Sequence, residues 1–248
     1  MEFENNINEY IEGRNAVIEA LRAGRAIDKI YIAKGEVDST LGHIASKARQ
    51  QGIVVVETDR RKLDAMSQTH AHQGVVALCA VKEYCSVEDL LQRAAEKGEP
   101  PFLVMCDEIS DPHNLGAIIR TAECVGAHGV IIPKRRSAGL TAVVDKASAG
   151  AAEHLPIARV PNLSAAIDTL KKAGVWVYGA AAEGSSPLWK TDLTGSICLV
   201  IGSEGDGISR LVREHCDVLV SIPMKGEISS LNASAAAAVL MYEALRQR

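Results

Sequence analysis

The C-terminal part of the chain alternates short, continuously apolar runs with amphipathic helical stretches, and this alternation strongly limits the possible folds. The runs at 102–107, 129–133, 175–181 and 197–201 lack the period-two polarity of a half-exposed strand. Strands that are buried on both faces occur in parallel sheets covered by crossover helices. We therefore expect residues 102–248 to form an α/β domain with a mostly parallel sheet.

A smaller α/β unit is expected before this sheet. Its predicted helices and strands alternate and end on the Val-rich run 74–81, after which the chain becomes more polar and is interrupted at Gly98-Glu-Pro-Pro101. We expect an N-terminal domain over 1–82, a linker over 83–101 and the larger domain over 102–248.

Composition excludes several classes of protein. Hydrophobic residues make up 47% of the 248 residues, which is enough for a sizeable core. No apolar run reaches the roughly 20 residues that span a membrane, and the acidic start at Met1-Glu-Phe-Glu is unlike a secretory signal. We therefore expect a cytoplasmic protein without a membrane partner.

Cysteine, histidine and charge patterns narrow the chemistry further. The six Cys include no Cys-x-x-Cys pair, so we expect buried free thiols, and the seven His lack ligand spacing, so we expect no metal site. The net charge of -4 argues against a purely electrostatic nucleic-acid binder, although Lys134-Arg-Arg136 forms a local basic cluster.

Three polar or glycine-rich segments follow predicted strands, at 107–116, 202–207 and 222–232. In a parallel sheet, ligands bind beyond the carboxyl ends of the strands. In the first segment we expect Asn114 to cap a helix. Arg120 lies among apolar residues of that helix, and we expect it to share a face with Gly116 and to point into a cleft or toward a partner.

The other two segments leave alternatives open. The stretch Ile201-Gly-Ser-Glu-Gly-Asp-Gly207 lacks the dinucleotide and phosphate-loop fingerprints, which disfavours a nicotinamide oxidoreductase. Ser229, Ser230, Asn232 and Ser234 precede an Ala-rich helix. They are either helix caps alone or also part of a ligand site.

In this order and spacing, the three segments resemble the motifs of the SpoU-type RNA ribose 2'-O-methyltransferases of the trefoil-knot superfamily. The matching stretches are Asn114-Leu-Gly-Ala-Ile-Ile-Arg120, Ile201-Gly-Ser-Glu-Gly-Asp-Gly207, Ile222-Pro-Met-Lys-Gly226 and Ser230-Leu-Asn-Ala-Ser234. One departure is Ala233, where many relatives have Val. The resemblance implies a deep trefoil knot, a homodimer and S-adenosylmethionine as cofactor.

The N-terminal part adds a second resemblance. Glu12-Gly-Arg-Asn-Ala-Val-Ile-Glu-Ala-Leu21 and His72-Gln-Gly-Val-Val-Ala77 are similar to a small, ribosomal-protein-like substrate-binding domain of the family members that methylate large-subunit rRNA. This implies methylation of a ribose 2'-hydroxyl, on a guanosine, in 23S rRNA. Two alternatives remain: a transfer RNA ribose methyltransferase, and a catalytically silent RNA-binding protein of ribosome assembly.

The resemblance also implies roles for particular residues. The cofactor is expected at backbone groups of Gly202, Ile222 and Leu231, with Met224, Ser230 and Gly207 nearby. Arg120 is expected to act in catalysis, with the other pocket residues being Asn114, Glu204, Ser230 and Asn232. A guanidinium is a poor base, because its pKa exceeds about 12. Arg120 is therefore either a base or an electrostatic stabiliser. Candidate RNA contacts are Arg14, Asn15, Lys134, Arg135 and Arg136.

Overall fold

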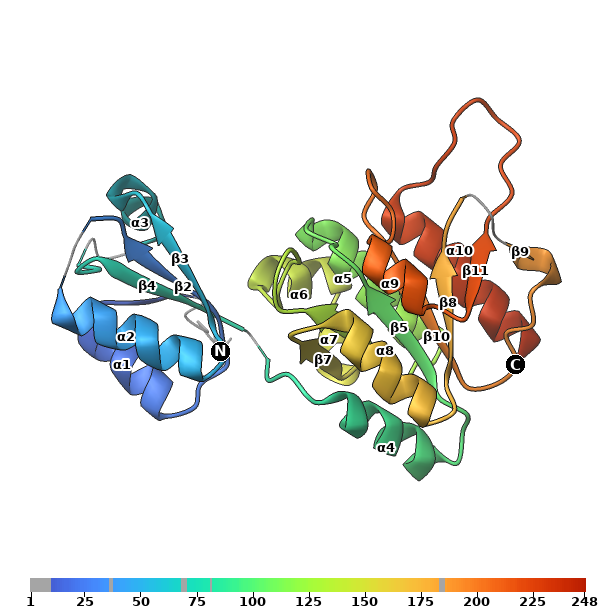
Figure 1. Ribbon diagram of the computed structural model, residues 1–248, viewed down its shortest axis with the longest axis horizontal. Coiled ribbons are helices and arrows are strands. Elements are labelled where there is room, and N and C mark those ends of the chain that lie inside the picture. Colours follow the sequence, from blue (N-terminus) through green and yellow to red (C-terminus); the bar gives the residue numbers. More distant parts are fainter. Residues whose placement is uncertain (1–9, 36–37, 68–70, 81, 183–185) are drawn as a thin grey trace, which may run out of the picture. The chain divides into compact units, whose positions relative to one another are not determined.

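The structure is a computed structural model, and it describes residues 10–35, 38–67, 71–80, 82–182 and 186–248. Two compact units follow one another along the chain, the first up to Glu83 and the second from Tyr84. Each unit has its own sheet and its own apolar core (Figure 1).

The first unit is built on a four-stranded mixed sheet in the order β1-β4-β2-β3. β4 runs antiparallel to β1 and β2, whereas β3 is parallel to β2. Its strands are β1 (Tyr10–Glu12), β2 (Ile27–Ala33), β3 (Val54–Thr58) and β4 (Val75–Cys79), and its helices are α1 (Arg14–Arg22), α2 (Ser39–Gln50) and α3 (Arg60–Met66).

The helices of this unit cover the two faces of its sheet unequally. α1 and α2 pack together over the face that carries Ile30 and Val75, in a core of thirteen buried residues. α3 adds Leu63 to a smaller cluster with Ala33 and Val76, which alternate with the first set and so lie on the opposite face. The unit therefore has a complete core of its own.

The second unit is built on a seven-stranded sheet in the order β7-β6-β5-β10-β8-β11-β9, and all its paired strands are parallel. The strands are β5 (Phe102–Cys106), β6 (Gly129–Pro133), β7 (Ile157–Val160), β8 (Trp176–Ala180), β9 (Ser186–Pro187), β10 (Ile197–Ile201) and β11 (Val218–Ser221). β5 and β10 are buried at every position, as their unbroken apolar sequences predict. The prediction of a parallel α/β sheet is confirmed. The order of the strands does not show whether the C-terminal segment passes through a loop of the chain, so the knot stays a prediction.

Helices cover both faces of this sheet (Figure 1). They are α4 (Val87–Lys97), α5 (Pro112–Cys124), α6 (Ala142–Ser148), α7 (Ala151–His154), α8 (Leu163–Lys172), α9 (Arg210–His215) and α10 (Ala233–Gln247), with a short 3-10 helix η1 at Leu188–Lys190. Side chains of α4, α8 and α9 share one core with Leu103 and Met105 of β5. α5 and α10 pack against each other, and α10 also packs against β10.

Most of the segment 83–101, which was expected as a linker, is occupied by α4, and this helix is part of the second unit. A capping box between Ser86 and Asp89 starts the helix, and Gly98 ends it at a φ of 67°. Val87 and Leu90 are buried in the second core. The charged side of α4 is exposed, and its apolar side covers the sheet.

A buried histidine ties the start of β5 to the start of β6. The His128 side chain is 1% exposed; its Nδ1 accepts the Phe102 N–H at 3.0 Å, and its Nε2 lies 3.1 Å from a Glu99 carboxylate oxygen. Nδ1 must therefore carry no proton, and Nε2 is the donor. Burial lowers the pKa of His128.

This geometry predicts a loss of stability on acidification. The folded-state pKa of His128 is lowered, so its contribution is complete above the ordinary histidine pKa of about 6.5 and is lost as pH falls below it. We expect the melting temperature to decrease from pH 7.5 to pH 5.5 more steeply in wild type than in His128→Gln. Other titrating groups are common to both proteins, so equal slopes would contradict the assignment.

Candidate active site

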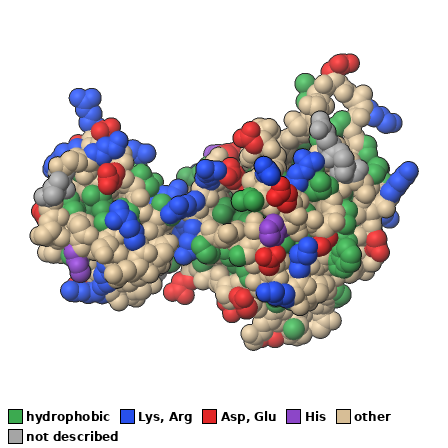
Figure 2. Space-filling view, in the orientation of Figure 1, with side chains coloured by type: hydrophobic (Ala, Val, Ile, Leu, Met, Phe, Trp, Pro, Cys, Tyr) green, Lys and Arg blue, Asp and Glu red, His purple; other side chains and the backbone are tan. Residues whose placement is uncertain are grey.

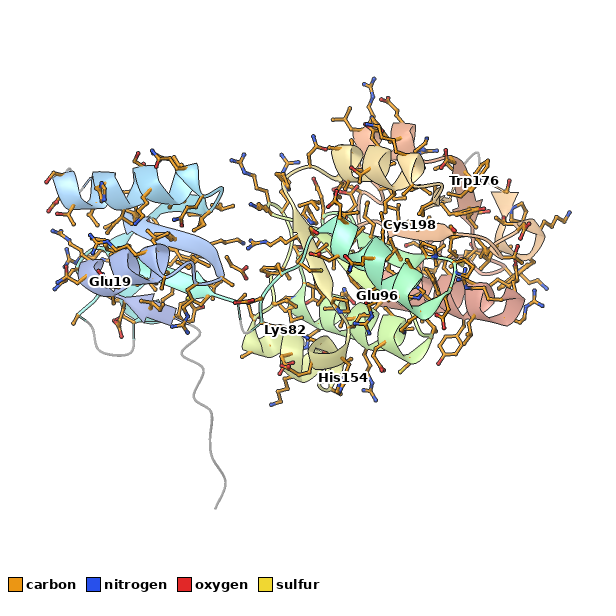
Figure 3. The ribbon with its side chains drawn as sticks, turned by 90° about the horizontal axis from the view of Figure 1, so that it is seen from below. Glu19, Lys82, Glu96, His154, Trp176 and Cys198 are labelled. Carbon is orange, nitrogen blue, oxygen red and sulfur yellow. The ribbon has the colours of Figure 1, made fainter. Side chains whose placement is uncertain are left out.

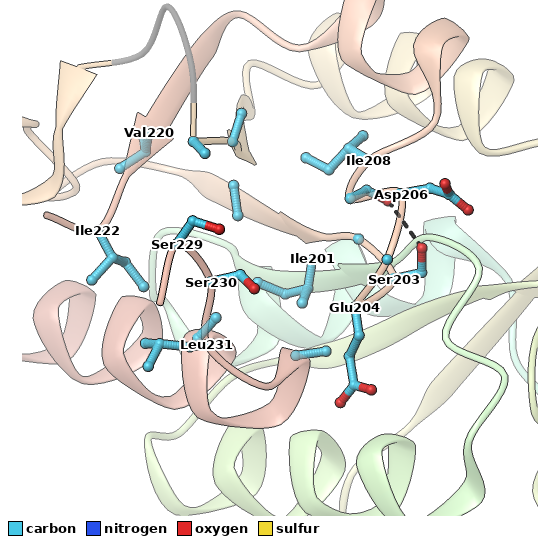
Figure 4. Close-up of a pocket in the computed structure, with 18 of the residues that line it drawn as sticks. Ile201, Ser203, Glu204, Asp206, Ile208, Val220, Ile222, Ser229, Ser230 and Leu231 are labelled. Atoms are coloured by element: carbon cyan, nitrogen blue, oxygen red, sulfur yellow. Dashed lines mark hydrogen bonds between the residues drawn. The ribbon is translucent and has the colours of Figure 1, made fainter. Parts of the chain in front are cut away.

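The main cavity of the second unit lies beyond the carboxyl ends of β8, β10 and β11. Its volume is about 350 Å³, within the range of small-molecule pockets. Two of the three predicted segments line it, and across the cavity Ser229 and Ser230 face the loop that carries Ser203 and Asp206 (Figure 4). The lining residues are Ala180, Ala181, Ala182, Ile201, Gly202, Ser203, Glu204, Gly205, Asp206, Gly207, Ile208, Arg213, Val220, Ile222, Met224, Ser229, Ser230, Leu231, Ala233 and Ala236.

The glycine-rich loop between β10 and α9 forms one wall. Ser203 and Gly207 exchange two backbone hydrogen bonds of 3.0 Å each, which closes the loop on itself. Gly202 lies so close to the returning chain that an added Cβ would be 2.1 Å from the carbonyl carbon of Gly207. Gly207 adopts a φ of 67°, where glycine is favoured. Both glycines are therefore required by the shape of the loop.

Three side chains from the three predicted segments meet beside this loop. Asn114 Nδ2 donates to Glu204 Oε1 at 2.9 Å, and Asn232 Nδ2 donates to Asn114 Oδ1 at 3.0 Å and also to Glu204 Oε1. Glu204 and Asn232 lie 90 and 118 residues after Asn114 in the sequence. The network therefore brings together residues that the motifs named separately.

Helix caps explain how two of these side chains are placed. Asn232 is the N-cap of α10 and its Oδ1 accepts the N–H groups of Ser234 and Ala235, so its Nδ2 is left for the network. The prediction that Asn114 caps α5 is wrong. Asp111 is the N-cap, with Pro112 in the first turn, and this frees the Asn114 side chain for Glu204.

Another wall of the cavity is the segment between β11 and α10, which extends away from the sheet in Figure 1. It contributes Ile222, Met224, Ser230 and Leu231 to the cavity. Met224 and Leu231 are 39% and 38% exposed. A ligand in the cavity would cover them.

Neither Arg120 nor Gly116 of α5 lines the cavity. Gly116 is buried against α6, where an added Cβ would lie 2.4 Å from Ala147 Cβ, so the close approach is made by protein and not by a ligand. Arg120 is exposed and lies outside the cavity lining. Within the described part of the chain it has no hydrogen-bond or ion-pair partner.

No cysteine is among the residues that line the cavity. All six cysteines are free thiols, and Cys198 lies inside the second unit (Figure 3). Burial, followed by the charge of Asp107, raises the pKa of the Cys106 thiol to about 12. Burial also raises the pKa of the Cys198 thiol. Among the described residues, no cluster of His, Cys, Asp and Glu is suited to hold a metal ion.

The candidate RNA contacts differ in how free their side chains are. The Arg14 side chain is already bonded within the first unit: its Nε donates to the Gln73 carbonyl at 3.0 Å, and its Nη1 pairs with Asp38 at 2.6 Å. Asn15 is exposed in the first turn of α1. In the second unit, Arg136 pairs with Glu108 at 3.0 Å, and its neighbours are Lys134, which is partly buried, and Arg135, which is exposed.

Sequence reasoning missed part of the cavity. Ala180 ends β8, Ala181 and Ala182 follow it, and Arg213 lies on α9. β8 lies between β10 and β11 in the sheet, and that order carries its carboxyl end to the cavity. The apolar run 175–181 gave a strand but carried no signal for its position in the sheet.

Comparison with known proteins supplies the family. Residues 101–242 match the SpoU rRNA Methylase family, and residues 10–85 match the family described as RNA 2'-O ribose methyltransferase substrate binding. A Bacillus subtilis protein, whose name places it among the TrmH family tRNA/rRNA methyltransferases, is 48% identical over 97% of this chain and 96% of its own length.

Solved structures agree with this result. The AdoMet-bound rRNA methyltransferase from Sinorhizobium meliloti has a TM-score of 0.60 at 27% identity, with 96% of this chain and 86% of that chain covered. The TrmH/SpoU tRNA modifying enzyme of A. aeolicus has a TM-score of 0.55 at 28% identity, with 65% of this chain and 84% of that chain covered.

The chain belongs to the SpoU family of RNA methyltransferases, which includes the TrmH proteins. Its cofactor is S-adenosylmethionine, and its first unit carries the match to the family described as RNA 2'-O ribose methyltransferase substrate binding. In the described part of the chain, no helix combines the length and apolar character needed to cross a membrane.

Proposed function

We propose that this protein transfers a methyl group from S-adenosylmethionine to the 2'-hydroxyl of a guanosine ribose in 23S rRNA. The network of Asn114, Glu204 and Asn232 beside the cavity carries this proposal, because it unites the three motifs in one site. We also propose that the protein acts in the cytoplasm.

The choice of rRNA over transfer RNA rests on how much of the chain each neighbour covers. The rRNA methyltransferase structure covers 96% of the chain, whereas the tRNA modifying enzyme covers 65%. Residues 10–85 match a substrate-binding family, and this unit accounts for much of the difference. An additional RNA-binding unit suits a large, folded RNA.

The cavity fits S-adenosylmethionine in size and in lining. It combines apolar walls at Ile201, Val220 and Leu231 with the hydroxyls of Ser229 and Ser230 and the backbone of the glycine-rich loop. We assign the adenine and ribose to backbone groups of Gly202, Ile222 and Leu231, with Gly207, Met224 and Ser230 beside them. The cofactor supplies a methyl group on a sulfonium, which is already a strong electrophile.

The protein's own residues then have three tasks: alignment of the ribose, removal of the proton from its 2'-hydroxyl, and stabilisation of the oxygen as that proton leaves. Asn114, Glu204 and Asn232 hold one another in fixed orientation at the edge of the cavity, where Glu204 is exposed to an incoming hydroxyl. Arg120 carries a charge that is not paired within the described chain. We assign it to a phosphate of the RNA and to the charge that develops on the 2'-oxygen.

The decisive test is a map of 2'-O-methylation in rRNA and tRNA from cells with and without this protein. Loss of one methylated guanosine in 23S rRNA supports the proposal. Loss of a mark in tRNA alone identifies the nearest rival, a tRNA ribose methyltransferase. Unchanged maps, together with failure to bind S-adenosylmethionine in calorimetry, identify a silent RNA-binding assembly protein instead.

A homodimer is the second part of the proposal. The outward side of α10 carries Ala235, Val239 and Tyr242 at helical spacing, and Tyr242 is 54% exposed. Leu245, one turn further on, is 42% exposed. An apolar stripe of this kind is typical of a surface that another protein covers.

We expect Tyr242→Lys to convert the dimer into a monomer, because a charge would have to be buried at the interface. Sedimentation or light scattering measures the change directly. Trp176→Lys is the matched control, since Trp176 is 57% exposed on β8 of the same unit (Figure 3). A Tyr242→Lys protein that remains dimeric would place the interface elsewhere.

The first unit is proposed to bind rRNA. In the view of Figure 2, Lys and Arg side chains on both units are interspersed with Asp and Glu, in line with the net charge of -4. Affinity for a large RNA is therefore expected to need contacts from both units, with Asn15 in the first and Lys134, Arg135 and Arg136 in the second.

Removal of the first unit tests whether both units contribute to rRNA binding. Residues 84–248 contain a complete core, so the shortened chain is expected to fold and to bind S-adenosylmethionine. Its affinity for rRNA should decrease by at least about tenfold, as phosphate contacts are lost. Calorimetry and filter binding measure the two affinities, and unchanged rRNA affinity would exclude a binding role for the first unit.

A further inference from the structure

Asp107 is a buried carboxylate next to the cavity to which the proposed mechanism gives no role. It directly follows β5 and is 3% exposed. Its backbone N–H donates to the Ile201 carbonyl at 2.8 Å, and its Oδ2 accepts the Ser209 N–H at 2.6 Å. Ile201 and Ser209 are the residues immediately before and after the loop 202–208. One residue therefore holds both ends of the cofactor loop.

The two contacts differ in what they depend on. The bond to Ile201 uses backbone atoms and continues the pairing of β5 with β10, so it does not require an aspartate. The bond to Ser209 requires a side-chain acceptor that reaches across from a neighbouring strand, and it joins residues 102 positions apart. A carboxylate acceptor makes this bond short and strong.

The loop itself is closed but needs to be anchored. Ser203 and Gly207 pair with each other, and this fixes the shape of the loop without attaching it to the sheet. Asn114 and Asn232 hold Glu204 in the middle of the loop, and Ile208 is buried in the core. At the two ends of the loop, attachment comes from β10 and from the Asp107–Ser209 bond. The loop in turn presents Gly202 and Gly207 to the cavity and carries Glu204.

We propose that Asp107 is a positioning residue for the cofactor, because it fixes the exit of the glycine-rich loop in the shape that binds S-adenosylmethionine. The proposal rests on the assignment of this cavity to the cofactor. Asp107 acts through the loop and does not itself line the cavity.

The test compares Asp107→Ala with Asp107→Asn by calorimetry with S-adenosylmethionine. The Ala variant lacks an acceptor for the Ser209 N–H, so we expect its Kd to rise at least about tenfold. The Asn variant keeps an acceptor oxygen, so we expect its Kd to stay within about threefold of wild type. Affinity for rRNA should be unchanged in both variants, which a general loss of structure would not allow.

Ser209→Pro removes the same bond from the donor side. The φ of Ser209 is -57°, which suits proline. We expect this variant to match Asp107→Ala, and the double variant to bind no more weakly than either one. If Asp107→Ala does not fold, Ser209→Pro and Asp107→Asn carry the comparison.

Two results would overturn the proposal: a folded Asp107→Ala or Ser209→Pro protein with wild-type cofactor affinity, or an Asn variant as weak as the Ala variant. Failure of the wild-type protein to bind S-adenosylmethionine would instead remove the assignment of the cavity. The wild-type titration therefore separates failure of this inference from failure of the proposed function.

Discussion

Arg120→Ala is expected to lower methyl transfer by about 10²–10³-fold while leaving the affinity for S-adenosylmethionine unchanged. The side chain is exposed and lies outside the cavity lining, so its removal disturbs neither the cofactor walls nor the packing of α5. The loss then reports the interaction of the guanidinium with RNA during the reaction. Transfer from tritiated cofactor to unmodified rRNA measures it.

Glu123→Ala is the matched control, because Glu123 is an exposed residue of the same helix. We expect it to retain wild-type transfer. If Arg120→Ala also retains it, with an unchanged melting temperature, Arg120 has no catalytic role.

Arg120→Lys separates the two roles that the sequence left open. A guanidinium with a pKa above about 12 is a poor base near neutral pH, whereas either cation stabilises a developing negative charge. We therefore expect the Lys variant to recover part of the activity without a change in the pH dependence of the rate. A new ionisation in the pH–rate profile of the Lys variant would favour a base.

The sheet of the second unit was predictable because strands that are buried on both faces have continuously apolar sequences. β5 and β10 read as unbroken apolar runs, and a parallel sheet is the usual place for such strands. The order of the strands was not predictable. It depends on which crossovers pass over which face, and no single run such as 175–181 contains that information.

The site was predicted as motifs but not as geometry. Asn114 and Asn232 were both expected near the start of a helix. Asn232 is an N-cap, whereas Asn114 is not. Asp111 and Asn114 are both good capping residues, and Pro112 decides between them because proline suits the first turn of a helix. Local propensity therefore placed the cap three residues too late, and the hydrogen bond to Glu204 was visible only in the fold.

The same limit applies to α4 and to Gly116. The charges of 88–97 lie on the outer side of α4, and the sequence did not show which of the two units this helix covers. At Gly116 the sequence allowed either protein backbone or a ligand to approach closely, and the atoms that approach it belong to α6. A glycine shows that something lies close to the backbone, and the sequence does not show what that is.

Gly202→Ala is expected to abolish detectable binding of S-adenosylmethionine, with a rise in Kd of at least about a hundredfold. An added Cβ would lie 2.1 Å from the carbonyl carbon of Gly207, 2.3 Å from its oxygen and 2.3 Å from the Ile208 nitrogen. These are backbone atoms, so the contact cannot be relieved by rotation of a side chain. The loop must open at the point where its two arms cross, and the cofactor wall opens with it.

Gly205→Ala is the matched control in the same loop. Apart from Gly205 itself and its two chain neighbours, no residue that the structure describes has a heavy atom within 4 Å of the Cβ that this substitution would add. We expect its Kd to stay within about threefold of wild type, and replacing glycine can even stabilise a loop whose conformation suits alanine. Calorimetry on both variants, with melting temperatures to show that each is folded, completes the comparison. Tight binding by a folded Gly202→Ala protein would mean that the crossing of the loop arms is not needed for the cofactor site, and equal losses in both variants would mean that the loop tolerates no substitution at all.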